Sequence, residues 1–231
     1  ALPECYQPVF RYIRDVLVPS GEKTAEQVYG AKGWCAHVVT NPWGFTSLGW
    51  SYNWGVWSLG GVWCAALLWD YYEFTKDRDF LRQWLPVIEG AARFAADYVF
   101  YSPSEGMYMT GPSYSPENRF AMDDREYFLS LSPTCDCILI REILEIMEKC
   151  YEELGLKEDA FLEKSREIRE KLPPFCIGKE GGIQEWFHDF EEAVPNHRHT
   201  SHLLGLYPFA QITPEEQPEL ACAARRSISR R

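Results

Sequence analysis

The sequence has few basic residues and no long hydrophobic run, and both shortages limit the classes of function that the protein can have. Its 23 lysines and arginines are set against 34 aspartates and glutamates in 231 residues, a formal net charge of −11. That charge repels nucleic acids and anionic membranes. The longest apolar run, residues 62–69, is far shorter than the ~20 residues that cross a bilayer. We therefore expect neither nucleic acid nor a membrane interior as a partner.

Several common site motifs are also missing. The chain contains no G-x-S-x-G, no P-loop, no dinucleotide-binding glycine fingerprint and no CxxC pair. Its eight cysteines are too sparse for a disulfide-stapled domain, and several lie in apolar helical stretches where cysteine behaves as a small hydrophobic residue. Free, buried thiols are the prediction.

Aromatic residues, by contrast, are abundant. Nine tryptophans, 13 tyrosines and 13 phenylalanines make up 15% of the chain. Indole rings stack well on the apolar faces of sugar rings, and an acidic protein does not repel a neutral ligand. The composition therefore favours neutral ligands with apolar faces, with carbohydrates first among them.

The periodicity of the apolar residues is helical nearly everywhere. It predicts helices over residues 6–18, 57–74, 79–100, 137–154, 159–172 and 218–229. Asp79 and Asp159 are the expected N-caps, and short strands are expected at residues 107–109 and 182–183. Short turns alternate with long polar loops, a pattern typical of an all-α toroid of inner and outer helices. A plain helical bundle is the alternative, but it has little use for such loops. No linker divides residues 1–231, so a single domain is expected.

One candidate catalytic group lies in the loop over residues 109–120, MTGPSYSPENRF. Glu117 follows Pro116 and precedes Asn118, so its backbone is restrained and hydrogen-bond donors stand nearby. A rigid loop that presents a carboxyl group among aromatic residues suits a general acid. The alternative is a surface loop with an ordinary glutamate.

Four of the five histidines lie in a second segment, residues 184–209. His197, His199 and His202 have the spacing H-x-H-x-x-H, which raises the possibility of a metal site. However, the intervening Arg198 is a poor neighbour for a divalent cation, and arginine and histidine on a loop bind sugar hydroxyls equally well. We expect no metal. Glu185 and Trp186 pair an acid with an indole, which suits a sugar's polar edge and apolar face or, alternatively, a helix start with a core tryptophan.

A third segment, residues 33–57, is rich in glycine and tryptophan. Its five indoles surround several polar side chains, and so many are hard to bury in one core. Two or three are expected to be structural, and Trp43 and Trp54 are taken as stacking platforms for sugar rings. The residues involved are Trp34, Trp43, Trp50, Trp54 and Trp57, together with His37, Thr40, Asn41 and Asn53.

Together these segments resemble family 95 of the glycoside hydrolases, the inverting α-L-fucosidases and their α-L-galactosidase relatives. The matching stretches include AEQVYGAKGWCAHVVTNPWGFT, TGPSYSPEN, IGKEGGIQEWFHDFEE and HRHTSHLLGLYPFAQITPE, in the family's order and over nearly the whole chain. The resemblance implies an (α/α)6-barrel catalytic domain that hydrolyses terminal fucosyl residues of glycans without metal or cofactor.

The resemblance also assigns roles to residues. Glu117 of SPEN matches the general acid, and Arg198 and His199 of HRH match residues that bind fucose hydroxyls. The further residues expected to bind substrate are His37, Thr40, Asn41, Trp43, Trp54, Asn118, Glu185 and Trp186. Many relatives read His-Asn-Thr-Asp where this chain has His-Val-Val-Thr-Asn, so the choice between fucose and L-galactose stays open.

In the resembled family, an aspartate polarises asparagines that position the attacking water. Our alignment places those residues outside Ala1–Arg231, and about seven or eight helices are expected here against the twelve of a closed barrel. The chain is therefore interpreted as part of a larger enzyme, with little activity alone and with its compartment undecided. Two rivals remain: a non-catalytic carbohydrate-binding α/α barrel, and an α/α-barrel glycosidase or lyase of other specificity.

Overall fold

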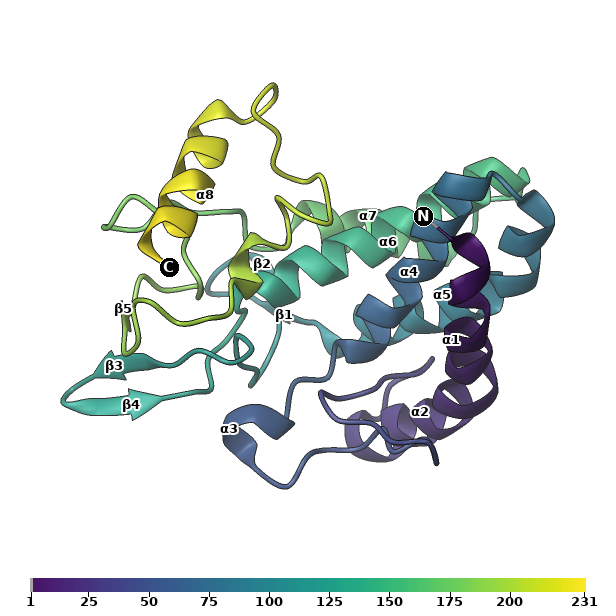
Figure 1. Cartoon of the computed structure of the whole chain (residues 1–231), viewed down its shortest axis with the longest axis horizontal. Coiled ribbons are helices and arrows are strands. Elements are labelled where there is room, and N and C mark those ends of the chain that lie inside the picture. The colour runs from purple at the N-terminus through teal and green to yellow at the C-terminus, as the bar shows by residue number, and fades with distance from the viewer. Residues whose placement is uncertain (1) are drawn as a thin grey trace. The chain divides into compact units, whose positions relative to one another are not determined.

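The computed structural model describes residues 2–231, and helices form most of its regular structure (Figure 1). The helices are α1 (Gln7–Tyr12), α2 (Val18–Thr24), α3 (Tyr52–Gly55), α4 (Gly60–Thr75), α5 (Arg78–Tyr98), α6 (Thr134–Leu154), α7 (Ala160–Glu170) and α8 (Pro218–Arg230). The strands are β1 (Phe100–Ser102), β2 (Met107–Met109), β3 (Phe120–Met122), β4 (Arg125–Tyr127) and β5 (Glu191–Glu192). Shorter helical turns occupy Pro3–Tyr6, Ile13–Leu17, Ala25–Tyr29 and Ser201–Leu203. A mainly helical class with a few short strands is what the sequence predicts.

The helix starts test the predicted N-caps. Asp159 caps α7 as predicted, because its carboxylate accepts hydrogen bonds from two amides of the first turn. The prediction for α5 is wrong: Asp77, and not Asp79, is the cap. Lys76 adopts the left-handed conformation that ends α4, so Asp77 is the first extended residue, and its Oδ1 accepts from the amides of Asp79 and Phe80.

The chain folds into two compact units, each built from three separate stretches. The first unit contains the residues up to Trp50, Ser58–Val99 and Ile140–Lys171. The second contains Ser51–Trp57, Phe100–Leu139 and Leu172–Arg231. Helix α6 supplies residues to both, and the single domain over residues 1–231 stays a prediction.

The first unit is helical and is built around two hairpins, α4–α5 and α6–α7. Phe10 of α1 packs edge-on against Tyr71 of α4, with ring centroids 5.4 Å apart, and lies 5.8 Å from Trp84 of α5. Helix α7 is joined to α6 by two ion pairs, Arg166 and Arg169 with Glu148, at 2.5 and 2.7 Å. Aromatic packing thus joins helices that are distant in sequence, and charge pairing joins the two helices of a hairpin.

A close approach of backbones in the first unit requires glycine. Gly33 has φ +73°, and a Cβ atom on it would lie 1.9 Å from the carbonyl oxygen of Gly90 in α5. Gly90 in turn leaves room for the buried ring of Trp34, whose Nε1 donates to the carbonyl of Val87 at 2.9 Å. Trp34 is therefore a structural tryptophan.

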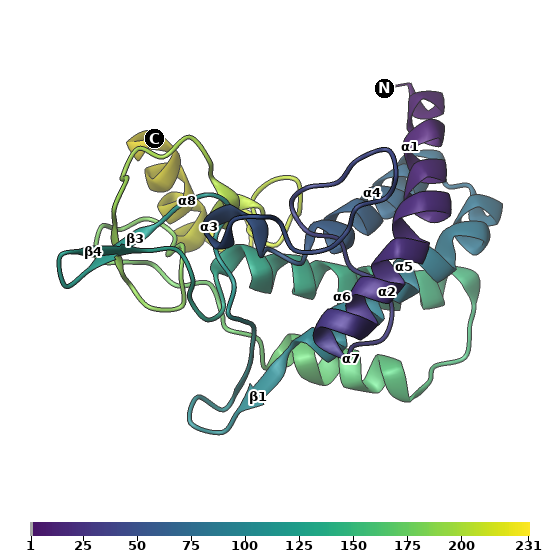
Figure 2. The ribbon, with the colours of Figure 1, turned by 90° about the horizontal axis from the view of Figure 1, so that it is seen from below.

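The second unit contains the strands and α8. β3 pairs antiparallel with both β4 and β5, with Phe120 opposite Tyr127 and Glu192, and Figure 2 shows the β3–β4 hairpin from a second direction. β1 and β2 form a separate hairpin, which confirms the strand predicted at residues 107–109. The expected strand at residues 182–183 is reduced to a single bridge between Ile183 and Ile177. One face of α8 is buried in a cluster of Ile183, Leu203, Ile212, Ala223 and Ala224.

A fully buried carboxylate joins two of the three stretches of the second unit. Asp136, in the first turn of α6, accepts from Trp57 Nε1 at 2.9 Å and from Thr110 Oγ1 at 3.0 Å. Burial raises the pKa of Asp136 to about 6, although these hydrogen bonds offset part of that effect. Trp57 is consequently a second structural tryptophan.

All eight cysteines are free, as predicted. The predicted burial is only partly right, because Cys5, Cys176 and Cys222 are exposed. Burial raises the pKa of the Cys35 and Cys150 thiols to about 12, which keeps them protonated. Among residues 2–231, no helix combines the length and the hydrophobicity needed to cross a membrane.

Candidate active site

Glu117 lies on a tight turn of the second unit. The turn comprises Ser115, Pro116, Glu117 and Asn118, and it is closed by a hydrogen bond from the Asn118 amide to the Ser115 carbonyl at 2.7 Å. Ser115 and Asn118 are fully buried, whereas the Glu117 side chain keeps 37% of its surface exposed. The hydroxyl of Ser201 donates to the Pro116 carbonyl. The turn therefore anchors both of its ends in the core and presents the carboxyl group between them to solvent.

Two residues of the HRH segment meet this carboxyl group. Arg198 Nη2 donates to Glu117 Oε2 at 2.8 Å, and His199 Nε2 lies 3.5 Å from the same oxygen. The Arg198 side chain is 73% exposed, so its donors are accessible to a ligand. The predicted acid and the two predicted hydroxyl-binding residues thus lie together although about 80 residues separate them in sequence.

Beneath the turn lies Glu185, which is 4% exposed. Its Oε1 accepts from Ser115 Oγ at 2.9 Å, and its Oε2 accepts from Asn118 Nδ2 at 2.8 Å. One carboxylate therefore holds both ends of the turn that carries Glu117. Asn118, expected to bind substrate, is fully buried and also donates to Glu192 at 3.1 Å.

The buried charge of Glu185 is balanced by Arg231, the residue after α8. Arg231 Nη2 lies 2.8 Å from Glu185 Oε2, and its Nη1 lies 2.8 Å from Glu192 Oε2. His202 Nδ1 is 3.5 Å from Glu185 Oε2, yet burial and the nearby Arg231 charge lower the pKa of His202 to about 3. His202 is therefore neutral at physiological pH, and Arg231 supplies the compensating charge.

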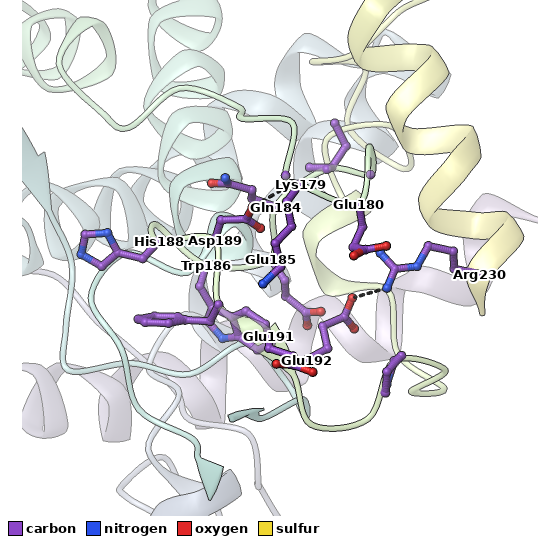
Figure 3. Close-up of a pocket in the computed structure, with 15 residues that line it drawn as sticks. Lys179, Glu180, Gln184, Glu185, Trp186, His188, Asp189, Glu191, Glu192 and Arg230 are labelled. Carbon is purple, nitrogen blue, oxygen red and sulfur yellow. Dashed lines mark hydrogen bonds and ion pairs between the residues drawn. The ribbon is translucent and has the colours of Figure 1, made fainter. Parts of the chain in front are cut away.

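Glu185 is also among the residues that line a cavity of about 360 Å³. It is lined mainly by the loop between residues 178 and 195, and by Arg230 of α8. Figure 3 shows these side chains, with a dashed line for the ion pair between Arg230 and Glu192. Trp186 lines the cavity but is itself 2% exposed, and it packs edge-on against Phe120 at 5.3 Å. The side chain of Trp186 therefore contributes to the core.

The histidine segment does not gather into a metal centre. His197 and His199 rings lie 5.3 Å apart, while His202 turns into the core toward Glu185. The part of the chain that the structure describes contains no group of three or more histidine, cysteine, aspartate or glutamate side chains able to hold a metal ion. Arg198 and His199 instead contact Glu117, and His202 lies near Glu185.

The first unit contains four further predicted substrate-binding residues, His37, Thr40, Asn41 and Trp43. His37 is buried, with Nδ1 2.7 Å from the Thr46 carbonyl and Nε2 2.6 Å from the hydroxyl of Tyr29, and burial lowers its pKa. Thr40 and Asn41 are exposed, and both contact the hydroxyl of Tyr12.

The exposure of the tryptophans separates two groups. Trp43 is 85% exposed and Trp50 80% exposed, whereas Trp34 and Trp57 are 1% and 5% exposed. Trp54, in α3 of the second unit, is partly buried and its carbonyl accepts from the hydroxyl of Tyr114. Two of the five indoles in this segment are therefore buried in the structure, in line with the expected number, and Trp43 remains open to a ligand.

Sequence reasoning did not identify Ser115, Glu192, Ser201 or Arg231. Ser115 stands two residues before Glu117, so its proximity in sequence was the available signal. Glu192 and Arg231 carry no local signal, because their role depends on where β5 and α8 pack. Glu192 accepts a hydrogen bond from Asn118, and Arg231 pairs with Glu185 and Glu192, and all of these are tertiary contacts.

Known proteins show the family to which the chain belongs. The model of the Glycosyl hydrolase family 95 catalytic domain matches residues 1–231. The chain is 38% identical to Alpha-L-fucosidase 2 of Arabidopsis thaliana over 231 residues, which is 99% of this chain and 27% of that protein. It is 26% identical to Probable alpha-fucosidase A of Aspergillus niger over 212 residues, 90% of this chain and 26% of that protein. The chain thus spans about a quarter of the length of these relatives.

Proposed function

The chain belongs to the glycosyl hydrolase family 95 catalytic domain, and from this premise we propose that it forms part of an enzyme that removes terminal α-L-fucosyl, or α-L-galactosyl, residues from glycans with inversion. The main support for this proposal is the position of Glu117 Oε2, which lies 2.8 Å from Arg198 Nη2 and 3.5 Å from His199 Nε2. The names of the two relatives support the choice of fucosyl substrates.

In the proposed reaction Glu117 is the general acid. Its carboxyl group transfers a proton to the glycosidic oxygen as the bond from that oxygen to the anomeric carbon breaks. Water attacks the anomeric carbon from the opposite face and loses a proton to the base side of the enzyme. An inverting arrangement places acid and base ~6.5–9.5 Å apart to leave room for this water.

Arg198 and His199 are proposed to bind the sugar hydroxyls. In the free protein, the Oε2 atom of Glu117 accepts a hydrogen bond from Arg198. A substrate whose hydroxyls take over the Arg198 donors frees that oxygen to face the glycosidic bond. Substrate binding and the availability of the acid are therefore coupled through one exposed guanidinium.

The fold proposed for this function is an (α/α)6 barrel. Its support is the pair of hairpins, α4–α5 and α6–α7, whose connections are short compared with the loops that carry Glu117 and Arg198. A crystal structure of the protein encoded by the whole reading frame tests this, since alternating inner and outer helices are expected.

The activity is tested by Glu117→Gln in the protein encoded by the reading frame that contains residues 1–231. We expect turnover of fucosides with poor leaving groups to fall by ~10²-fold or more, because glutamine cannot donate the proton. Proton NMR of the first product should show the β-anomer. Wild-type rates in the variant would remove Glu117 from the mechanism, and fucoside binding without hydrolysis by the wild type would favour a non-catalytic carbohydrate-binding protein.

A further inference from the structure

We infer that Glu185 is a positioning residue for the general acid and does not bind the sugar. This inference rests on the proposed function, because it assigns Glu185 a task only if Glu117 donates the proton. The structural basis is a single buried carboxylate that holds both ends of the four-residue turn carrying Glu117.

Protein groups donate three hydrogen bonds to the carboxylate of Glu185. Oε1 accepts from Ser115, and Oε2 accepts from Asn118 and from Arg231, at distances of 2.8 to 2.9 Å. The side chain is 3% exposed. Both oxygens therefore already accept hydrogen bonds from the protein, and little of the carboxylate is open to a sugar hydroxyl.

The geometry of the turn explains why two contacts are needed. Ser115 and Asn118 are its first and last residues, and the Asn118 amide closes it. Because both ends of the turn are hydrogen-bonded to Glu185, rotation of the turn is restricted. The direction in which the Glu117 side chain leaves the backbone is therefore restricted as well. A displacement of about 1 Å in a reacting group can cost ~100-fold in rate, so such a clamp has a catalytic consequence.

An ion pair with Arg231 balances the charge of the Glu185 carboxylate. A buried carboxylate needs a partner, and Arg231 provides it while also pairing with Glu192. Glu192 also accepts a hydrogen bond from Asn118 Nδ2, at 3.1 Å. The side-chain amide of Asn118 therefore donates to two carboxylates. Loss of the Glu185 charge would leave Glu192 as the carboxylate that pairs with Arg231. It would also weaken the contact with Ser115 or with Asn118, because a neutral amide has one acceptor oxygen where the carboxylate has two.

The test uses aryl α-L-fucosides whose leaving groups range from phenol to 2,4-dinitrophenol. A good leaving group needs little protonation, so a defect in the acid shows mainly with phenol. We expect Glu185→Gln to lower kcat on the phenyl fucoside by ~10–100-fold, to leave the dinitrophenyl fucoside within ~3-fold, and to change KM little. Ser115→Ala, which removes one contact of the clamp, should show the same pattern more weakly.

A double variant separates this inference from the proposed function. If Glu185 acts through Glu117, Glu117→Gln/Glu185→Gln should be no slower on the phenyl fucoside than Glu117→Gln alone. Glu126→Gln, at a half-exposed glutamate paired with Arg119 in the same unit, is the control and should retain wild-type rates.

Two kinds of kinetic defect in Glu185→Gln would overturn the inference. One is an equal loss on all leaving groups, and the other is a rise in KM with unchanged kcat, which would show that Glu185 binds the sugar. A Glu117→Gln variant without dependence on the leaving group would instead overturn the proposed function itself. Unchanged kinetics in Glu185→Gln, with Glu117→Gln defective as expected, would show that the clamp has no catalytic role.

Discussion

Arg198 and Glu117 form an ion pair at 2.8 Å, although 81 residues separate them in the chain. The pair joins a tight turn and a polar loop, and neither has regular secondary structure. Exposed ion pairs contribute little to stability, and Arg198 is 73% exposed. The pair therefore adds little to folding stability, and the ligand-binding role proposed for Arg198 makes this residue the first target for mutation.

Arg198→Ala should lower kcat/KM on fucosides by about 10–100-fold, as expected for the loss of a charge-assisted hydrogen bond to a sugar hydroxyl. Arg198→Lys should recover only part of this, because lysine keeps the charge but loses the planar fork. Steady-state kinetics provide the measurement. Arg82→Ala, at an exposed arginine paired with Asp79, is the control, and an equal effect there would refute a specific role for Arg198.

Trp57→Phe should destabilise the protein by ~2–4 kcal/mol. The substitution removes the donor to buried Asp136 and leaves a small cavity, and both effects lower the free energy of unfolding. Urea unfolding followed by circular dichroism measures it. Trp43→Phe makes the same chemical change at an 85% exposed position and should stay within ~0.5 kcal/mol of wild type. Similar losses in both variants would contradict the structural role assigned to Trp57.

The pH dependence of stability should reveal Asp136. Its pKa is about 6 in the folded protein, above the ~3.9 of an unfolded chain, so the folded state binds more protons between these values. Asp136 therefore contributes ~3 kcal/mol to the free energy of unfolding below about pH 4, and this contribution is lost as the pH rises through 6. Asp136→Asn should lack this component in thermal melts between pH 4 and 7. Asp79→Asn, at a side chain that is 93% exposed, should keep the wild-type slope.

Gly33→Ala should be among the most damaging alanine substitutions in the first unit. The new Cβ would lie 1.9 Å from the Gly90 carbonyl oxygen, so the loop or α5 would have to move. Gly30 has a similar φ of +61° with nothing within 4 Å of its added Cβ, which makes Gly30→Ala the matched control. Its cost should be ~1 kcal/mol from backbone strain, and Gly33→Ala should exceed this by several-fold in chemical denaturation. Equal costs would indicate that the close contact is absent.

Most of the helices could be predicted from the sequence, because amphipathic periodicity is a local property. The limits of α5 and α6 lie within three residues of those expected. The misplaced cap at Asp79 shows where such reasoning ends: Asp77 became the cap because α4 ended in a left-handed Lys76, which periodicity does not encode.

The candidate site was predictable only in part. The SPEN and HRH segments pointed to Glu117, Arg198 and His199, and the structure brings these three together. Glu185 was expected to touch the sugar, since an acid beside an indole has that appearance in sequence. Whether its carboxylate faces solvent or the core depends on the packing of the turn and of α8, which no local pattern reveals.

By itself, the sequence determined the helical class and the acidic charge and indicated the residues proposed to do the chemistry, because composition, periodicity and short motifs are properties of the sequence alone. Only the tertiary structure decided which carboxyl group is presented and which is buried. Glu117 and Glu185 are chemically equivalent side chains, and their difference arises because one is at the tip of a turn while the other lies beneath it, held by Ser115, Asn118 and Arg231.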